Sequence, residues 1–244
     1  MTTKHDDPNP LSSPSSPRLF EWLPDEGAVV DLRITPWPIR DQCSTPTGID
    51  ACAVFAATAV HEIARGQGEA VWLSELSLLS KMGGDATYGH HLEDTFLALR
   101  EHGQLCVSDY AVLNGCVDPG VAANGVSWRK VRIKPTSRAT GNIEKQVAAG
   151  RPVLLGLLQM VSLSMPDVSG VVRITDGDKA EGNLGEPVGH AVAVVGKTLI
   201  AGVLHFLVRN SWGEGWAREG YGLIDHRYVA RYGRDAAVVE SVID

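Results

Sequence analysis

FLVRNSWGEGWAREGYGLI, residues 206–224, carries the most specific pattern of this 244-residue chain. It predicts a strand that ends at Asn210, followed by tight turns at the glycines and by a second strand. On the first strand, residues two apart share a face, so Phe206, Val208 and Asn210 point the same way. The amide of Asn210 is therefore a candidate for orienting a side chain on a neighbouring strand.

An earlier strand, GHAVAVVG (189–196), supplies the side chain that Asn210 would orient. His190 and Val194 share a face of this strand. If the two strands form a hairpin in which Val194 pairs with Phe206, His190 lies opposite Asn210, with Cβ atoms about 5 Å apart. A shift of two residues in the glycine-containing connector would change that pairing. Asparagine in this place holds an imidazole ring in orientation without adding a negative charge.

GIDACAVFAATAVHE, residues 48–62, contains the candidate nucleophile Cys52. Its apolar residues cover most of the circumference of a predicted helix over 51–65, which is typical of a buried helix, and Asp50 is the predicted N-cap. A thiol at the second helical position feels the partial positive charge of the helix N-terminus. This charge lowers the thiol pKa and favours the attacking thiolate. A buried structural cysteine is the alternative interpretation.

The tryptophans and the other histidines take different roles. Trp212 is predicted to cover the His190–Asn210 hydrogen bond and to exclude competing water, whereas Trp216 is predicted to be an ordinary core residue. The alternative for His190 is a histidine buried and hydrogen-bonded in the core. Further histidines fall in the N-terminal segment, in the helix of Cys52, or near turns and helix ends: His5, His61, His90, His91, His102 and His226.

The order of the predicted elements favours an α+β fold with two lobes. Helices over 74–81 and 92–103 follow the helix of Cys52. After about residue 125, short strands separated by glycines dominate, with one helix at 142–150 between them. Residues 1–28 are predicted to form a flexible tail, whose first part is rich in Pro, Ser and Asp.

Composition and charge exclude several classes of function. The chain has 44% hydrophobic and 21% charged residues and a net charge of −7, which argues against binding to nucleic acid or anionic lipid. No stretch approaches the roughly 20 apolar residues that span a bilayer, and no secretory signal is present, so we expect a cytoplasmic protein. The cysteines, Cys43, Cys52, Cys106 and Cys116, lack the spacing of a zinc site, so we predict neither a metal nor another cofactor.

Together these stretches resemble the papain-like cysteine peptidases, of the bacterial type without a long propeptide. Matching segments follow one another in the order of that family: VDLRITPWPIRDQ (30–42), CAVFAATAVHE (52–62), LSELSLL (73–79), GHAVAVVG (189–196) and FLVRNSWGEGWAREGYGLI (206–224). His190 and Asn210 follow Cys52 by 138 and 158 residues, close to the family spacing of about 130–150.

The resemblance implies an architecture and a domain division. One papain-like peptidase domain is expected at 29–244. Its helical lobe (about 45–125) would pack against a β-rich, barrel-like lobe (about 126–244 plus the N-terminal strand). The active-site cleft would lie between the two lobes.

The resemblance also implies roles for individual residues. Cys52 would be the nucleophile, His190 the base and then the acid, and Asn210 the residue that orients His190. Gln42 would supply the side-chain amide of the oxyanion hole beside the Cys52 N–H. Trp212 would line the leaving-group side of the cleft. The substrate would be a polypeptide or peptide, with no metal, nucleic acid or membrane involved.

The sequence departs from the family pattern around the nucleophile. Ala51 precedes Cys52, and Ala53 stands where the family has an aromatic residue. Gln42 lies ten residues before Cys52, whereas the family spacing is about six, so we expect an insertion of about four residues in this loop. Because about 28 residues precede the domain, we expect control by a partner protein, narrow specificity or a mobile loop instead of a long propeptide.

Two other functions would use the same scaffold. A thiol-dependent amidase, deamidase or acyltransferase would fit an altered loop before Cys52, and a deamidase would release ammonia instead of new α-amino groups. A non-catalytic homologue would bind peptides in the same groove, and its Cys52→Ala variant would keep its full effect. Peptide-bond hydrolysis is the leading hypothesis, because all four catalytic residue types are present.

Overall fold

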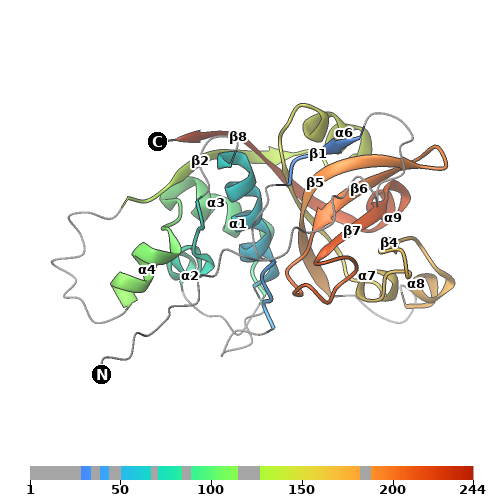
Figure 1. The fold of residues 1–244 in the computed structure, drawn as a ribbon, viewed down its shortest axis with the longest axis horizontal. Helices are drawn as coiled ribbons and strands as arrows, with labels where there is room; N and C mark the ends of the chain where they lie inside the picture. The colour runs from blue at the N-terminus through green and yellow to red at the C-terminus, as the bar shows by residue number, and fades with distance from the viewer. Residues whose placement is uncertain are drawn as a thin grey trace, which may run out of the picture.

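The computed structural model describes residues 29–33, 39–43, 51–66, 71–83, 89–114, 127–181 and 188–243. The predicted tail, Asp50 and Cys116 lie outside these ranges. In chain order the elements are β1 (Val30–Asp31), α1 (Cys52–Arg65), α2 (Glu75–Leu79), η2 (Ser80–Met82), α3 (Leu92–His102), α4 (Val107–Asn114), β2 (Lys130–Thr136), α6 (Thr140–Ala148), β3 (Val153–Leu158), α7 (Val161–Ser164), β4 (Val171–Val172), α8 (Asp176–Glu181), β5 (Gly189–Ile200), β6 (Val203–Arg209), β7 (Tyr221–Asp225), α9 (His226–Tyr232) and β8 (Gly233–Ile243). Figure 1 shows α1, α2 and α3 on one side of the molecule and β4 to β7 with α7 to α9 on the other.

α1 is a buried helix whose start differs from the prediction. All its residues except Ala64 are buried, as the apolar run predicts. The N-cap is Ala51, which makes no side-chain capping hydrogen bond, so the predicted cap at Asp50 is wrong. Cys52 is the first helical residue and not the second. It therefore lies in the turn whose backbone N–H groups point out of the helix end.

An open eight-stranded sheet forms the centre of the fold. The strand order is β2-β8-β3-β5-β6-β7-β4, with β1 paired to β5. Among the described strands, the path ends at β2 and β4, so the sheet does not close into a barrel. The unpredicted strand β8 pairs with both β2 and β3, while β2 packs against α3. One sheet thus extends from the helical side of the molecule to the strands that carry His190 and Asn210.

The β5–β6 hairpin has a register two residues away from the predicted one. Val194 pairs with Val208 and not with Phe206, so His190 is not directly opposite Asn210 along the ladder. The two-residue turn at Ala201 and Gly202 lies later in the chain than expected, which shifts the pairing by three residues, and a bulge between Val194 and Gly196 takes back one of them. His190 instead approaches Asn210 diagonally, which a side chain of this length can bridge.

The turn and the bulge of this hairpin have identifiable causes. The turn consists of Ala201 and Gly202, with φ of 49° and 72°, and positive φ at both central residues suits the twist of a tight hairpin. The bulge ends at Gly196, where β1 begins to pair with β5. A Cβ added there would lie 2.4 Å from the carbonyl oxygen of Val30, so only glycine leaves room for β1.

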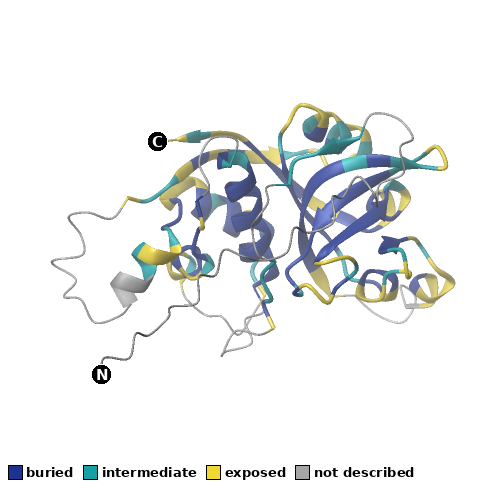
Figure 2. Ribbon diagram, viewed as in Figure 1, coloured by how far each residue is buried: buried dark blue, intermediate teal, exposed yellow. Residues whose placement is uncertain are grey.

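The two faces of the sheet support two hydrophobic cores, and Figure 2 shows α1 and most of β5, β6 and β7 as buried. Ala191 and Ala193 of β5 pack toward α1 and α3. Val192 and Val194 pack on the opposite face with residues of α6 and α9, as the period of two requires. The small alanines let the helix of Cys52 approach the strand of His190 closely.

The C-terminal end of α1 is tied to the sheet by a buried polar chain. Arg65 Nη2 donates to the carbonyls of Lys130 (2.7 Å) and Ile243 (2.9 Å), and its Nε donates to His61 Nε2 (2.9 Å). His61 Nδ1 donates to Gln104 Oε1 at 2.9 Å. Because Nε2 accepts a hydrogen bond, the ring is neutral, and burial lowers the pKa of His61 to about 3.

In the part of the chain that the structure describes, no helix is long and apolar enough to span a bilayer.

Candidate active site

The site is built around a hydrogen-bonded pair from neighbouring strands. His190, near the start of β5, and Asn210, directly after β6, are each 4% exposed. His190 Nε2 lies 2.7 Å from Asn210 Oδ1. The backbone N–H of Ser211 also donates to Oδ1, at 2.8 Å, and this second donor fixes the orientation of the amide. Nε2 therefore carries a proton, and Nδ1 is the nitrogen of the neutral ring that can accept one.

Trp212 covers this pair. Its ring stacks on the His190 ring with centroids 4.4 Å apart and planes at 29°. Trp216 meets Trp212 edge-on at 6.0 Å and donates through Nε1 to the carbonyl of Leu163 at 2.9 Å. Trp216 is buried, as predicted, and it braces Trp212 against the core. This stack limits the access of water to the His190–Asn210 hydrogen bond.

Gln42 meets the same loop from a distant part of the sequence. Ser211 Oγ donates to Gln42 Oε1 at 2.6 Å, and the Gln42 backbone N–H donates to the Ser211 carbonyl at 2.8 Å. Asp41 forms an isolated β-bridge with Trp212. The Ser211 hydroxyl donates to Oε1 of the Gln42 amide. Nε2, which is the donor of this amide, is therefore the end that points away from the hydroxyl. The insertion expected after Cys43 falls in 44–50, outside the described residues.

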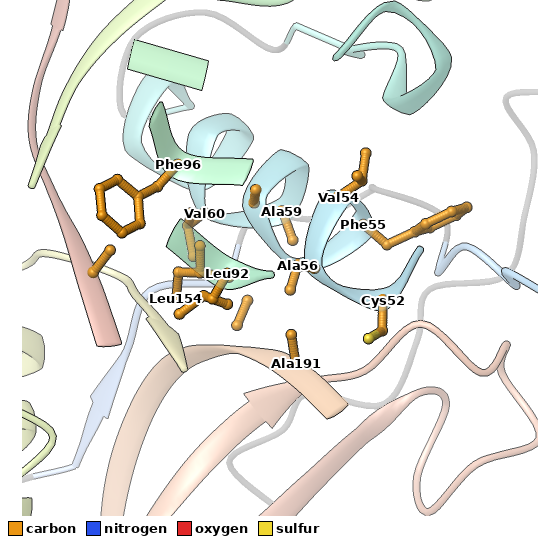
Figure 3. Packing of buried hydrophobic residues seen from close by; sticks show 14 of the residues in the cluster. Cys52, Val54, Phe55, Ala56, Ala59, Val60, Leu92, Phe96, Leu154 and Ala191 are labelled. Carbon is orange, nitrogen blue, oxygen red and sulfur yellow. The ribbon is translucent and has the colours of Figure 1, made fainter. Parts of the chain in front are cut away.

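Cys52 lies at the start of α1 and is 9% exposed. Figure 3 shows its sulfur on the side of α1 that faces β5, the strand on which Ala191 is labelled. A cavity of about 10 Å³ is lined by Phe55 and Ala56 of α1 together with Ala191 and Asn210. The first turns of α1 therefore lie beside the His190 end of β5.

Burial determines the protonation of His190. It lowers the pKa of His190 to about 4, and the hydrogen bond to Asn210 opposes this shift. In the absence of a neighbouring anion the ring is therefore neutral at pH 7 and can act as a base through Nδ1. An anion beside the ring would favour the imidazolium form.

Four charged side chains lie behind the site, two of them buried and two half-buried, and we call Arg40, Glu62, Glu75 and Arg209 the charge cluster. Arg40 Nη2 lies 2.7 Å from Glu62 Oε1, and its Nη1 lies 2.5 Å from Glu75 Oε1. Arg209 Nη1 lies 3.6 Å from Glu62 Oε2. Sequence analysis missed this cluster and also the role of Ser211. The available signal was position, because Arg40 nearly adjoins Gln42 and Arg209 directly precedes Asn210.

Metal and disulfide chemistry find no support in the described ranges. There, no group of three or more His, Cys, Asp or Glu side chains is placed to hold a metal ion. Cys43, Cys52 and Cys106 form no disulfide. The described residues supply an oriented imidazole on β5 and a thiol at the start of α1.

A sequence model of the papain family of cysteine proteases matches residues 28–241. The chain belongs to this family. Among curated relatives, Cysteine proteinase 3 of Solanum lycopersicum is 27% identical over 184 residues, which cover 70% of this chain and 49% of that protein. The chain therefore spans about half the length of this relative.

Solved structures share the fold. Xylellain, a cysteine protease from Xylella fastidiosa, superposes with a TM-score of 0.66 at 20% identity, covering 91% of this chain and 87% of that one. Digestive procathepsin L 3 of the Tenebrio molitor larval midgut gives a TM-score of 0.62 at 19% identity, covering 87% and 69%. The papain-like α+β architecture expected from the sequence is confirmed.

Proposed function

We propose that this protein is a cysteine peptidase that hydrolyses peptide bonds. Cys52 is the nucleophile, His190 the general base and acid, and Asn210 the residue that orients His190. The observation that carries the proposal is the double hydrogen bond to Asn210 Oδ1, from His190 Nε2 and from the Ser211 N–H. It keeps Nε2 protonated throughout and reserves Nδ1 for proton exchange with the nucleophile and the leaving group.

The ground state would be a thiolate–imidazolium pair. The N-terminal turn of α1 favours a negative charge on Cys52, and the thiolate in turn stabilises a proton on His190 Nδ1. Burial lowers the pKa of His190 to about 4, which by itself would leave the ring neutral. The thiolate beside it would explain how the ring can still carry the proton that catalysis needs. Each charge is stable because the other is present, so the two groups titrate as one unit.

The reaction proceeds in two steps. The Cys52 thiolate attacks the scissile carbonyl, forming a C–S bond and an oxyanion. As the C–N bond breaks, His190 Nδ1–H transfers its proton to the leaving amine and a thioester remains. Water then attacks the thioester while Nδ1 takes its proton, which releases the carboxylic acid and regenerates Cys52.

The oxyanion would be held by two donors. One is the Cys52 backbone N–H in the first turn of α1, and the other is Nε2 of Gln42. The hydrogen bond from Ser211 to Gln42 Oε1 supports this role, because it sets which end of the amide is available to donate. Donors fixed before the reaction stabilise developing charge with little reorganisation. Trp212 would border the leaving-group side of the site.

The test compares wild type with Cys52→Ala on a mixture of diverse peptides, with new termini mapped by mass spectrometry. We expect new α-amino termini with wild type alone. Cys106→Ala, which also removes a thiol outside any disulfide, is the matched control and should cleave like wild type. Release of ammonia without new termini would identify a deamidase instead. Identical products from wild type and Cys52→Ala would refute the proposal.

A further inference from the structure

Arg40 joins the charge cluster to the segment that carries Gln42. Its Nη2 donates to Glu62 Oε1 of α1 at 2.7 Å and to the Leu73 carbonyl at 2.8 Å, and its Nη1 meets Glu75 at 2.5 Å. The Arg40 guanidinium therefore contacts α1, the segment directly before α2, and α2 itself. Its side chain is 13% exposed, so these contacts are largely shielded from water.

The main chain around Arg40 is held from the opposite direction. The N–H of Gly213 donates to the Arg40 carbonyl at 3.2 Å, and the N–H of Gln42 donates to the Ser211 carbonyl at 2.8 Å. Residues 39–43 therefore lie between α1 and α2 on one side and the loop after Asn210 on the other. The Arg40 side chain binds residues 39–43 to α1 and α2.

Electrostatics make the contacts of Arg40 strong and favour arginine over lysine at this position. The Glu62 side chain is fully buried, and a buried carboxylate without a close cation is costly. Arg209 approaches Glu62 only to 3.6 Å, so Arg40 is the closer of its two cations, and the Leu73 N–H donates to the same Oε1 at 2.9 Å. The planar guanidinium donates to two acceptors through Nη2 and places Nη1 beside the Glu75 carboxylate, an arrangement that a lysine ammonium on a flexible stem reproduces poorly.

We propose that Arg40 is a positioning residue that, through the charge cluster, holds the Gln42 amide where it can stabilise the oxyanion. The inference rests on the proposed peptidase function. Arg40 itself touches no reacting atom. It acts by fixing the backbone two residues before Gln42, while Ser211 fixes the side chain of Gln42.

The consequence for kinetics is specific. Oxyanion stabilisation exists only in the transition state, so its loss lowers kcat and leaves KM nearly unchanged. The thiolate–imidazolium pair does not involve Gln42. Alkylation of Cys52 by iodoacetamide forms no oxyanion at a carbonyl, so its rate reports on that pair alone. A general loss of structure would lower both kcat and the alkylation rate.

The experiment is a double-mutant cycle with Gln42→Ala, Arg40→Gln and the double variant, assayed on a peptide substrate found with wild type. We expect Gln42→Ala to lower kcat about 100-fold and Arg40→Gln about tenfold or more. The double variant should match Gln42→Ala within about threefold, because loss of Arg40 cannot displace an amide that is already absent. Arg40→Lys should recover part of the kcat, and alkylation of Cys52 should stay within about twofold of wild type in every variant.

Arg33→Gln is the matched control. Arg33 also has a 13% exposed side chain and pairs with a carboxylate, Asp31, at 2.8 Å, and its guanidinium lies over the ring of Tyr221 instead of against the charge cluster. Fully multiplicative losses in the cycle, or an Arg40→Gln kcat equal to that of Arg33→Gln, would overturn the inference. Glu75→Gln provides a milder variant if Arg40→Gln does not fold, and it should also lower kcat without slowing alkylation. Failure of the peptidase proposal is distinguishable, because wild type would then show no turnover that depends on Cys52.

Discussion

The hydroxyl of Ser211 donates a 2.6 Å hydrogen bond to Oε1 of Gln42, although 169 positions separate the two residues in the chain. Ser211 directly follows Asn210, whose Oδ1 accepts the Ser211 N–H. One residue therefore orients two amides, with its backbone on one side and its hydroxyl on the other. The two halves of the proposed catalytic apparatus are coupled at this single position.

Ser211→Ala should destabilise the fold more clearly than it slows the reaction. Removing the hydroxyl leaves Gln42 Oε1 buried without this donor, which costs about 1–3 kcal/mol. We expect kcat to fall less than about tenfold, because the backbone bond from Gln42 to Ser211 persists. Chemical denaturation and peptide kinetics measure the two effects. Ser80→Ala, which removes a hydroxyl bonded to the Ser77 carbonyl outside the site, is the control.

Asn210→Ala should lower kcat by about 10- to 100-fold. Without Oδ1, the His190 ring can rotate and Nε2 loses its acceptor, so Nδ1 is no longer held in position. Peptide kinetics give the loss. Asn142→Ala removes an amide that bonds Thr136 and Ser137, away from the site, and should leave kcat unchanged. An Asn210→Ala enzyme as fast as Asn142→Ala would show that ring orientation is unimportant.

The titration of His190 should depend on the Cys52 sulfur. In Cys52→Ala no thiolate is present, so His190 should stay neutral until the pH falls to about 4. In wild type the thiolate should keep the ring protonated at neutral pH. Ring nitrogen chemical shifts from NMR, measured against pH, distinguish the two states. Equal His190 titration curves in the two proteins would mean that no ion pair forms.

His61 should make the fold less stable in acid. Its pKa is about 3 when folded and about 6.5 when unfolded, so the unfolded chain binds the extra proton between these values. The stabilising contribution is complete above pH 6.5 and is lost as the pH falls toward 3, at up to about 1.4 kcal/mol per pH unit. His61→Gln should flatten this part of the curve of unfolding free energy against pH. A slope unchanged by the substitution would contradict the assignment.

Local patterns predicted much of the fold. The apolar run after Cys52 placed α1 within one residue, and alternation along β5 correctly divided Val192 and Val194 from Ala191. The hairpin register was wrong, because the turn lies at Ala201 and Gly202, later than predicted, and the bulge before Gly196 offsets only part of that shift. β8 was missed because its charged residues, such as Glu240, interrupt the alternation that marks a strand.

From local patterns alone, the candidate site was predictable only where adjacent strands bring its residues together. The meeting of His190 with Asn210 followed from face and strand order, even with the register shifted. The charge cluster did not follow, because Arg40, Glu62 and Glu75 come from three separate segments. A charged residue in sequence is by default a surface residue, and only tertiary packing reveals which ones are enclosed together.

The continuous strand β8 has a consequence for how ligands are received. It pairs with β2, which packs against α3, and with β3, which adjoins the strand of His190. A rigid-body hinge motion between the helical side and the strands that carry the site would have to break the backbone hydrogen bonds of β8. Opening and closing around a substrate must therefore be confined to loops and side chains. A substrate would then bind to a site that is already formed in the folded protein, and the selectivity for substrates would follow from the shape of that site.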